Sequence, residues 1–301
     1  MAIREQLTSK TLLTLGRASR AIPHFRGKSR ALRLLDRTLR RVGELDGPVR
    51  CDLNGLRMDL DPTEGIQFSL LYTGSYGANV RFFLDAAIRQ HPDAQGPPIL
   101  WDIGANIGAI SLTLANGLPQ LAVHSFEPSP SVHATLAHNL GLNPHLTSRV
   151  TLHELALSNE AGEATFYPSD QDGNQGVGSL QDTSYGTAKA ITVRRAVPDT
   201  LIADGLAPPP THIKIDVEGF EMEVLLGLEA MLAGPSPPTV VVEHAIERLD
   251  SRGMPRDAVT HWLVERGFHL HFIHPDGTTH PQTYADRDRH HDYAAIPTGQ
   301  G

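Results

Sequence analysis

The sequence has few cysteines, few aromatic residues and no long hydrophobic run. Cys51 is the one cysteine among 301 residues, so an internal disulfide framework is excluded. Aromatic residues make up 6% of the chain, which predicts a core built mainly from Leu, Ile, Val and Ala. No apolar stretch reaches the ~18 residues of a membrane helix, and the first residues lack the apolar block of a secretory signal. We therefore expect a cytoplasmic enzyme.

The charge is distributed unevenly along the chain. Residues 1–50 contain 12 basic and 4 acidic side chains, whereas the rest contains 14 basic and 30 acidic ones. Leu32, Leu35, Leu39 and Val42 recur at helical spacing, and we expect this stripe to pack on the main domain or on a second subunit, giving a homo-oligomer. A basic N-terminal arm also suggests binding to an anionic membrane surface, an organellar transit peptide, or binding to a nucleic acid. A nucleic-acid partner is disfavoured because the acidic remainder repels phosphates.

Two regions are expected. Residues 1–90 are interpreted as a helical extension and lid region, with a β-hairpin turn at Asn54-Gly55. Residues 91–301 alternate short apolar runs with helical patterns, which predicts βαβ units and a parallel sheet. The expected strands are residues 99–103, 121–126, 150–155, 212–216, 239–243, 268–273 and 292–296. Residues 160–198 interrupt this rhythm as a loop and hairpin insertion. Its Gly-rich stretch, residues 170–184, contains Asn174, Gly176 and Ser179, which are candidates to close over a ligand.

A glycine-rich turn follows the first strand of the main domain, with the pattern Asp102-x-Gly104-x-Asn106-x-Gly108 before a helix expected at residues 107–115. Ligands of open α/β sheets bind at such strand ends, and the helix start offers N–H groups. The spacing does not match the G-x-G-x-x-G of a dinucleotide site. Asp102 would repel a pyrophosphate but suits an ammonium group, and Glu127 at the next strand end can accept hydrogen bonds from ribose hydroxyls. Taken singly, Asp102 could cap a helix and Glu127 could be a solvated strand end.

Four segments together resemble the FkbM family of S-adenosylmethionine-dependent methyltransferases, and they occur in the family's order over about residues 99–245. They are Asp102 to Gly108, Ser125-Phe-Glu-Pro-Ser-Pro130, Ala156-Leu-Ser158 and Ile213-Lys-Ile-Asp-Val-Glu-Gly-Phe-Glu221. The resemblance implies a class I, Rossmann-like α/β fold, with a mostly parallel, twisted seven-stranded sheet and helices on both faces. It also implies O-methylation of a sugar or natural-product hydroxyl. The residues that it assigns to cofactor binding are Asp102, Gly104, Asn106, Gly108, Phe126, Glu127, Pro128, Ala156, Ser158 and Asp216.

Candidates for the chemistry lie at the ends of the fourth and fifth expected strands. Methyl transfer from a sulfonium to a hydroxyl requires alignment and removal of a proton. His244 is our first candidate base, because an imidazole ordinarily titrates at about pH 6.5. Asp216 and Glu218 could orient the acceptor or hold Mg²⁺, which takes part in the more distantly similar macrocin O-methyltransferase group. Glu218 could equally be a helix-start acid, and His244 a satisfied strand-end histidine. A zinc site in the histidine-rich tail is not favoured, because its spacing is not compact.

Three rival functions are kept as alternatives. A nucleic-acid methyltransferase would use the basic N-terminal arm. An NAD-type oxidoreductase would use the same kind of sheet, although the glycine spacing disfavours it. A non-catalytic module would bind the cofactor without transferring its methyl group.

Overall fold

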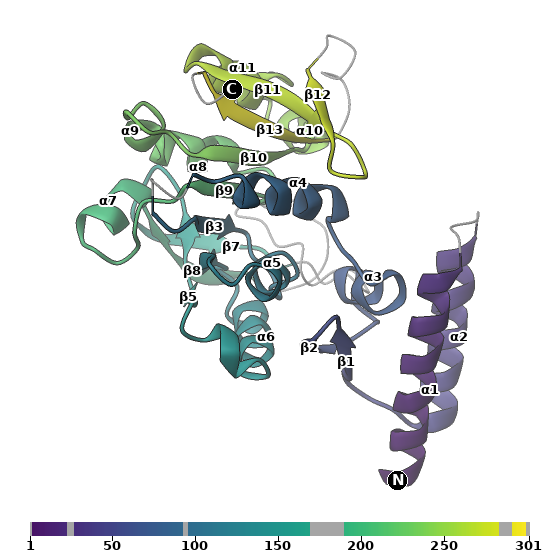
Figure 1. The fold of residues 1–301 in the computed structure, drawn as a ribbon. Coiled ribbons are helices and arrows are strands. Elements are labelled where there is room, and N and C mark those ends of the chain that lie inside the picture. The colour runs from purple at the N-terminus through teal and green to yellow at the C-terminus, as the bar shows by residue number, and fades with distance from the viewer. Residues whose placement is uncertain (1, 23–26, 93–95, 169–189, 283–290, 299–301) are drawn as a thin grey trace. The chain divides into compact units, whose positions relative to one another are not determined.

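The computed structural model describes residues 2–22, 27–92, 96–168, 190–282 and 291–298 (Figure 1). These residues form two compact units, which are described separately. Unit 1 contains the described residues up to Tyr76, and unit 2 contains those from Gly77 onward, apart from a segment outside the described ranges. None of the helices in these ranges combines the length and the hydropathy needed to cross a membrane.

Unit 1 begins with two packed helices, α1 (Ala2–Ala21) and α2 (Lys28–Gly43). Their contact is close, because a Cβ added at Gly43 would lie 1.8 Å from the hydroxyl of Thr8. The buried face of α2 carries charge. Asp36 accepts a hydrogen bond of 2.8 Å from the Tyr72 hydroxyl and forms an ion pair of 3.2 Å with Arg40. Buried charges need such partners, so these contacts fix which face of α2 turns inward.

The apolar stripe expected to pack is not the buried face of α2. Leu32 is buried, but Leu35 is 47% exposed and Val42 is 70% exposed. The residues of α2 that are buried are Leu32, Asp36, Arg40 and Gly43. Helical spacing identified a real stripe, but the polar partners of Asp36 and Arg40 decided the helix orientation. Within unit 1, Leu35 and Val42 therefore do not face the neighbouring elements, and their packing on the main domain or on a second subunit stays a prediction.

The predicted hairpin is confirmed in unit 1. Strands β1 (Val49–Leu53) and β2 (Leu56–Leu60) pair antiparallel. Asn54 and Gly55 between them have φ values of 55° and 87°, the left-handed conformation that tight hairpin turns require. Helix α3 (Gly65–Thr73) follows, and it contacts α1.

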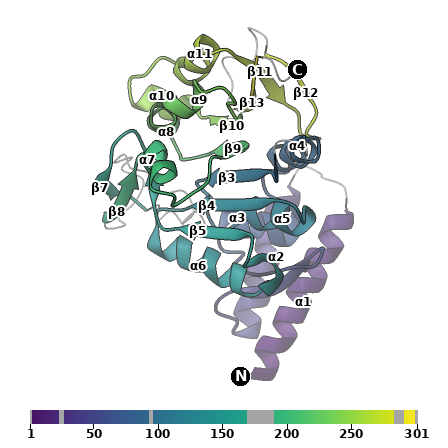
Figure 2. The same ribbon diagram turned by 60° about the vertical axis from the view of Figure 1, so that its left-hand side comes forward.

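Unit 2 is built around a sheet whose strand order is β12-β11-β13-β10-β9-β3-β4-β5 (Figures 1 and 2). Its parallel part consists of β5 (Val150–His153), β4 (Ala122–Phe126), β3 (Ile99–Ile103), β9 (His212–Ile215) and β10 (Thr239–His244). Strand β13 (His291–Pro297) pairs antiparallel with both β10 and β11 (Phe268–Ile273). The seven strands expected from the sequence are all present.

The sheet has one strand more than expected. The addition is β12 (Thr279–Pro281), a three-residue edge strand that pairs with β11. It is too short to produce a periodic signal. A proline is tolerated in an edge strand, because its missing N–H can lie on the side that has no neighbouring strand. An α/β fold with a mostly parallel sheet is confirmed, with eight strands in place of seven among the described residues.

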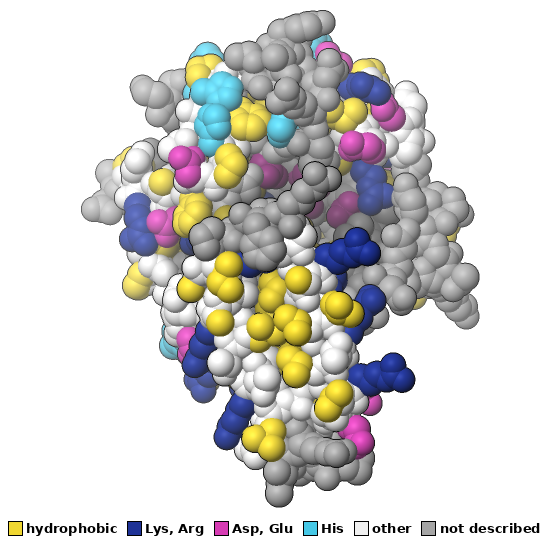
Figure 3. All heavy atoms as spheres, turned by 90° about the vertical axis from the view of Figure 1, so that its right-hand side faces the viewer, with side chains coloured by type: hydrophobic (Ala, Val, Ile, Leu, Met, Phe, Trp, Pro, Cys, Tyr) yellow, Lys and Arg dark blue, Asp and Glu magenta, His cyan; other side chains and the backbone are white. Residues whose placement is uncertain are grey.

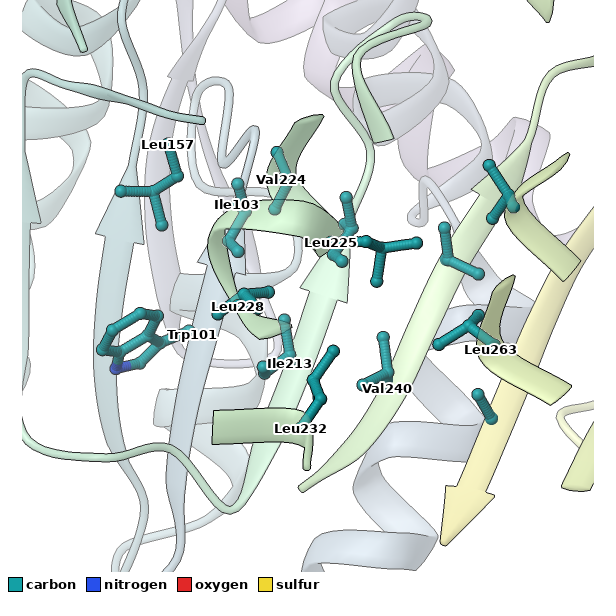
Figure 4. Close-up of a cluster of buried hydrophobic side chains, with 14 of the residues drawn as sticks. Trp101, Ile103, Leu157, Ile213, Val224, Leu225, Leu228, Leu232, Val240 and Leu263 are labelled. Carbon is teal, nitrogen blue, oxygen red and sulfur yellow. The ribbon is translucent and has the colours of Figure 1, made fainter. Parts of the chain in front are cut away.

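Helices cover both faces of this sheet. On one face lie α7 (Pro198–Ala203), α8 (Glu221–Gly227), α9 (Glu229–Leu232) and α11 (Ala258–Glu265). Their apolar side chains share a buried cluster with Trp101, Ile213 and Val240 of the strands (Figure 4). On the opposite face, α5 (Ser111–Gly117) packs against the polar side chain of Asp102. The remaining helices are α4 (Ala78–Arg89), α6 (Pro130–Gly141), η2 (Pro144–Leu146) and α10 (Ile246–Ser251).

Unit 2 also contains a smaller sheet, whose strands follow β5 in the chain. Strand β8 (Ile191–Ala196) pairs parallel with β6 (Ala156–Leu157) and antiparallel with β7 (Gly162–Phe166). A loop and hairpin insertion was expected at residues 160–198, and the antiparallel pair β7 and β8 forms a hairpin there. Asn174, Gly176 and Ser179, proposed to close over a ligand, lie outside the described residues.

Candidate active site

The strand order reverses between β3 and β9. From β3 the chain proceeds outward to β4 and β5, and it later returns beside β3 as β9 before proceeding to β10. Asp102 pairs in register with Lys214, and the N–H of Asp216 donates to the carbonyl of Ile103 at 3.1 Å. Loops diverge from such a reversal, which makes the carboxyl ends of the strands the usual ligand position in open α/β sheets.

The glycine-rich turn folds over the end of β4. The N–H groups of Gly104 and Ala105 both donate to the carbonyl of Phe126, each at 3.0 Å. Gly104 has a φ of 78°, and a Cβ there would lie 1.8 Å from the carbonyl oxygen of Asp216. Glycine is thus required at this position by the approach of two strand ends, in addition to any ligand.

The helix after this turn begins later than expected. The pattern predicted residues 107–115, whereas α5 starts at Ser111 and ends at Gly117. Asn106 adopts a left-handed φ of 51°, and its side-chain oxygen accepts the N–H of Ile107 at 2.8 Å. This local turn replaces the first helical turn, so the N–H of Ile107 is not free as the helix interpretation assumed.

Asp102 lies behind the turn. Its side chain is fully buried, and one oxygen accepts hydrogen bonds from both the backbone N–H and the hydroxyl of Ser111. Ser111 also accepts a bond of 2.8 Å from Ser125. The other carboxylate oxygen is 3.3 Å from the Lys214 ammonium. These contacts anchor the start of α5 to the sheet.

Lys214 is at the centre of the site, although we did not predict it as a site residue from the sequence. Its ammonium donates to the carbonyl of Gly104 at 2.8 Å and lies 3.3 Å from both Asp102 and Asp216. The residue is only 6% exposed. A lysine between Ile213 and Ile215 in a short predicted strand was the available signal, because a buried ammonium needs anionic partners. Lys214 thus ties the loop to both strand ends.

Glu127 occupies the end of β4. One oxygen of its carboxylate accepts the N–H of Asn106 at 3.0 Å, and the other accepts the N–H of Ser129 at 2.9 Å. Burial is the largest influence on this group, and it raises the pKa of Glu127 to about 7. The hydrogen bonds and the Lys214 charge oppose that rise in pKa. The group is therefore poised between its neutral and charged forms near neutral pH.

The other proposed cofactor residues lie near the ends of β4 and β6. The Phe126 ring is buried, stacked 4.5 Å from His153 and tilted 5.1 Å from Trp101. Pro128 is half-buried. Ser158 is buried, and its N–H donates to Ala196 at 3.0 Å, beside the β6 strand that contains Ala156. Ala156 and Ser158 therefore belong to the small sheet.

Asp216 and Glu218 lie in the turn that joins β9 to α8. The Asp216 side chain is 28% exposed, and Glu218 accepts a hydrogen bond of 3.0 Å from Arg248. Glu218 has a left-handed φ of 55°, so it precedes the helix instead of forming its first turn. Glu221, absent from our candidates, accepts the N–H of Gly219 at 3.0 Å. Its burial is the main reason that its pKa rises to about 7.

His244 ends β10 at the same edge of the sheet. Its side chain is 1% exposed, and the ring meets Tyr293 edge-on at 5.6 Å between centroids. The structure therefore groups Asp102, Gly104, Lys214 and Asp216 through direct contacts, with Glu127 joined through Asn106. His244 lies one strand further along. In the described ranges, no group of three or more His, Cys, Asp or Glu side chains is arranged to hold a metal ion.

Comparison with known families decides between the classes of protein that use such a sheet. A model described as the methyltransferase FkbM domain matches residues 102–270, more than half of the chain. The chain belongs to the FkbM methyltransferase family. The match begins at Asp102 and extends past His244, so all of the candidates fall within the FkbM domain. The resemblance noted in the sequence is confirmed, and so is the assignment to a methyltransferase family.

Two curated relatives share this sequence similarity, and one solved structure is reported beside them. The hexuronic acid methyltransferase AglP of Haloferax volcanii is 30% identical over 52% of this chain and 61% of its own length. The 31-O-demethyl-FK506 methyltransferase FkbM of Streptomyces tacrolimicus is 28% identical over 44% of this chain and 59% of its own length. The match thus spans about three fifths of each relative. A crystal structure of methyltransferase FkbM from Methylobacillus flagellatus KT covers 90% of this chain and is covered to 72%, at 17% identity and a TM-score of 0.49.

Proposed function

We propose that this protein transfers a methyl group from S-adenosylmethionine to a hydroxyl group of a sugar or another natural product. One observation carries the proposal: the turn from Asp102 to Gly108 lies at the switch point of the sheet, with the Glu127 and Asp216 carboxylates at the adjacent strand ends. The names of two relatives support the acceptor class. One specifies a hexuronic acid, and the other specifies an oxygen-linked methyl group.

The residues present fit this cofactor by their chemistry. Each oxygen of Glu127 accepts one N–H from the chain, and a carboxylate oxygen has two lone pairs, so both retain acceptor capacity for ribose hydroxyls. The Lys214 ammonium at the turn is already paired with two carboxylates, so it is a poor partner for a pyrophosphate. The site therefore suits a ligand with hydroxyl and ammonium groups better than a dinucleotide.

When bound, S-adenosylmethionine would supply an electrophilic methyl group on a sulfonium. Glu127 would hold the ribose, with Asn106, Phe126, Pro128, Ala156 and Ser158 lining the nucleoside side. Asp102 contributes from behind the loop, because its buried contacts to Ser111 and Lys214 keep the turn in place. Asp216, which is partly exposed beside Gly104, would face the methionine end. Alignment is the main contribution that such residues make to a direct displacement.

Removal of the hydroxyl proton requires a base. His244 is proposed because a neutral imidazole can accept a proton, and Asp216 because its carboxylate is partly exposed beside the turn. We expect the base to be revealed by turnover at saturating cofactor, because replacing it should lower kcat by about 100-fold or more. Cofactor affinity should stay near normal for the His244 variant, whereas the Asp216 variant should also weaken it, since Asp216 faces the methionine end. His244→Asn and Asp216→Asn are the matched pair, measured for both kcat and binding of S-adenosylhomocysteine. If neither variant loses turnover, the base lies elsewhere, and Glu218→Gln is the next variant.

The cofactor assignment is tested by calorimetry of the whole chain with S-adenosylhomocysteine and with NAD. Saturable binding of the first and none of the second supports the proposal, whereas binding of NAD alone contradicts it. The acceptor class is tested by incubation with methyl-labelled S-adenosylmethionine and a panel of uronic acids and hydroxylated macrolides. Label in an alkali-stable ether identifies O-methylation, and a chelator tests for Mg²⁺ in the same assay. Cofactor binding without transfer to any hydroxyl compound would favour the non-catalytic alternative.

A further inference from the structure

Outside the proposed active site, helices α1 and α2 of unit 1 have an apolar surface. Large aliphatic side chains stand exposed there, led by Val42 at 70%, Leu34 at 68% and Leu7 at 60%. Leu35 and Ile22 are about half exposed. Isolated exposed leucines are ordinary, but a group of them on two packed helices marks an interaction surface.

Basic side chains border this apolar group. Arg30, Arg37 and Arg41 are exposed on α2, as are Lys10 and Arg17 on α1. Figure 3 faces these helices and shows the hydrophobic side chains gathered together, with Lys and Arg to both sides. Among the described side chains of α1 and α2, the acidic one is Asp36, which is buried against Arg40 and Tyr72. The surface is thus apolar and positively charged.

The basic side chains and the apolar side chains form neighbouring rows along α2. Arg30, Arg33, Arg37 and Arg41 recur every three or four residues, which places them in one row along the helix. Ala31, Leu35 and Val42 form a second row, and Leu34 adjoins both. Helices that lie in a membrane interface have this arrangement, with apolar side chains for the acyl region and Lys or Arg for the headgroups.

We propose that α1 and α2 dock this protein on the surface of a membrane that contains anionic lipids. Charge complementarity selects this occupant. A second copy would bring the same arginine rows face to face, and like charges oppose such pairing. A nucleic acid would match the charge but not the exposed leucines, and neither helix contains an aromatic side chain on which bases could stack. The inference is independent of the proposed methyl transfer.

The test uses the full chain and sedimentation with lipid vesicles. Vesicles of phosphatidylcholine alone are compared with vesicles in which phosphatidylglycerol replaces about one third of the lipid. We expect binding to the anionic vesicles that weakens with added salt. The double variant Arg37→Glu/Arg41→Glu should bind at least about 25-fold more weakly, because each basic residue near an anionic surface contributes about fivefold.

The apolar contribution is tested by Leu34→Gln/Val42→Gln, with Leu226→Gln/Val264→Gln in unit 2 as the matched control. The first pair should lower vesicle binding about tenfold or more, and the control should not. All four residues are exposed, so circular dichroism and binding of S-adenosylhomocysteine should stay unchanged. The proposal is overturned by an absence of binding at low salt, or by Leu34→Gln/Val42→Gln binding as well as the wild type. A dimer that this variant abolishes, without vesicle binding, would show instead that a second copy covers the surface.

Discussion

At the scale of single residues, Glu127 connects the fold to the proposed cofactor. Its carboxylate holds the turn through Asn106 and the following segment through Ser129, and burial raises its pKa to about 7. A protonated carboxyl group has less capacity to accept hydroxyl hydrogens than a carboxylate. The charge state of this one residue should therefore control the affinity for the ribose end of the ligand.

We expect the affinity for S-adenosylhomocysteine to rise about five- to tenfold between about pH 6 and pH 8, because Glu127 loses its proton over that interval. Calorimetry at a series of pH values measures it. Glu127→Gln should bind weakly and with a flat pH profile, since an amide does not titrate. A wild-type profile that is equally flat would contradict the role given to this carboxylate.

Lys214 provides a second residue-scale prediction. Lys214→Met should lower the free energy of unfolding by about 3–5 kcal/mol, because it leaves the Asp102 and Asp216 carboxylates without the cation between them. Urea unfolding provides the measurement, and Lys10→Met, at an exposed position on α1, is the control. If the two variants were equally stable, the buried contacts of Lys214 would not matter to the fold.

At the scale of elements, the turn between β3 and α5 explains why the helix begins late. Hydrophobic spacing places Ile107 and Ile110 on a helical face, but the left-handed Asn106 and the anchoring of Ser111 by Asp102 begin the helix four residues further on. Gly104 is needed in this turn because its φ is 78° and Asp216 lies against it. Spacing alone does not contain that contact, which joins segments more than 100 residues apart.

Gly104→Ala should therefore lower the free energy of unfolding by about 3 kcal/mol or more and abolish binding of S-adenosylhomocysteine. Gly117→Ala, at the last residue of α5, is the matched control. A Cβ at Gly117 meets nothing within 4 Å, and alanine should stabilise the helix by about 0.5–1 kcal/mol. Thermal unfolding of both variants tests the argument. Equal tolerance of the two substitutions would mean that the strand ends can separate without cost.

At the scale of the whole molecule, Glu127 and Glu221 link stability to pH. In an unfolded chain a glutamate titrates at about pH 4.3, whereas burial raises both pKa values to about 7 in the folded protein. Between these values the folded state binds more protons than the unfolded state. The contribution of each group is therefore fully present below about pH 4.3 and is lost as the pH rises through about 7.

Glu221→Gln should remove part of this loss of stability at rising pH. Its amide oxygen can still accept the N–H of Gly219, and the amide carries no charge. Relative to the wild type, the variant should gain up to roughly 3 kcal/mol of stability between about pH 5 and pH 8. Urea unfolding across this range measures it, with the exposed Glu163→Gln as control. Parallel profiles for the wild type and Glu221→Gln would contradict the burial argument.

The sequence by itself determined seven of the eight strands described in the large sheet of unit 2, and the class of the fold. Short apolar runs such as residues 99–103 and 239–243 form buried parallel strands, because helices cover both faces of the sheet. The glycine-rich turn after Asp102 marks the switch point of the strand order. Those signals are local, and they also identified the FkbM family. Only the tertiary structure decided which face of α2 is buried, where α5 begins and why Lys214 lies in an apolar strand. Each of these depends on a polar partner that hydrophobic spacing does not reveal. The partners are Tyr72 for Asp36, Asp102 for Ser111, and Gly104 for Lys214. Hydrophobic periodicity carries no information about such partners. A buried charge is stable only beside a polar or oppositely charged group, and the tertiary structure decides which group that is.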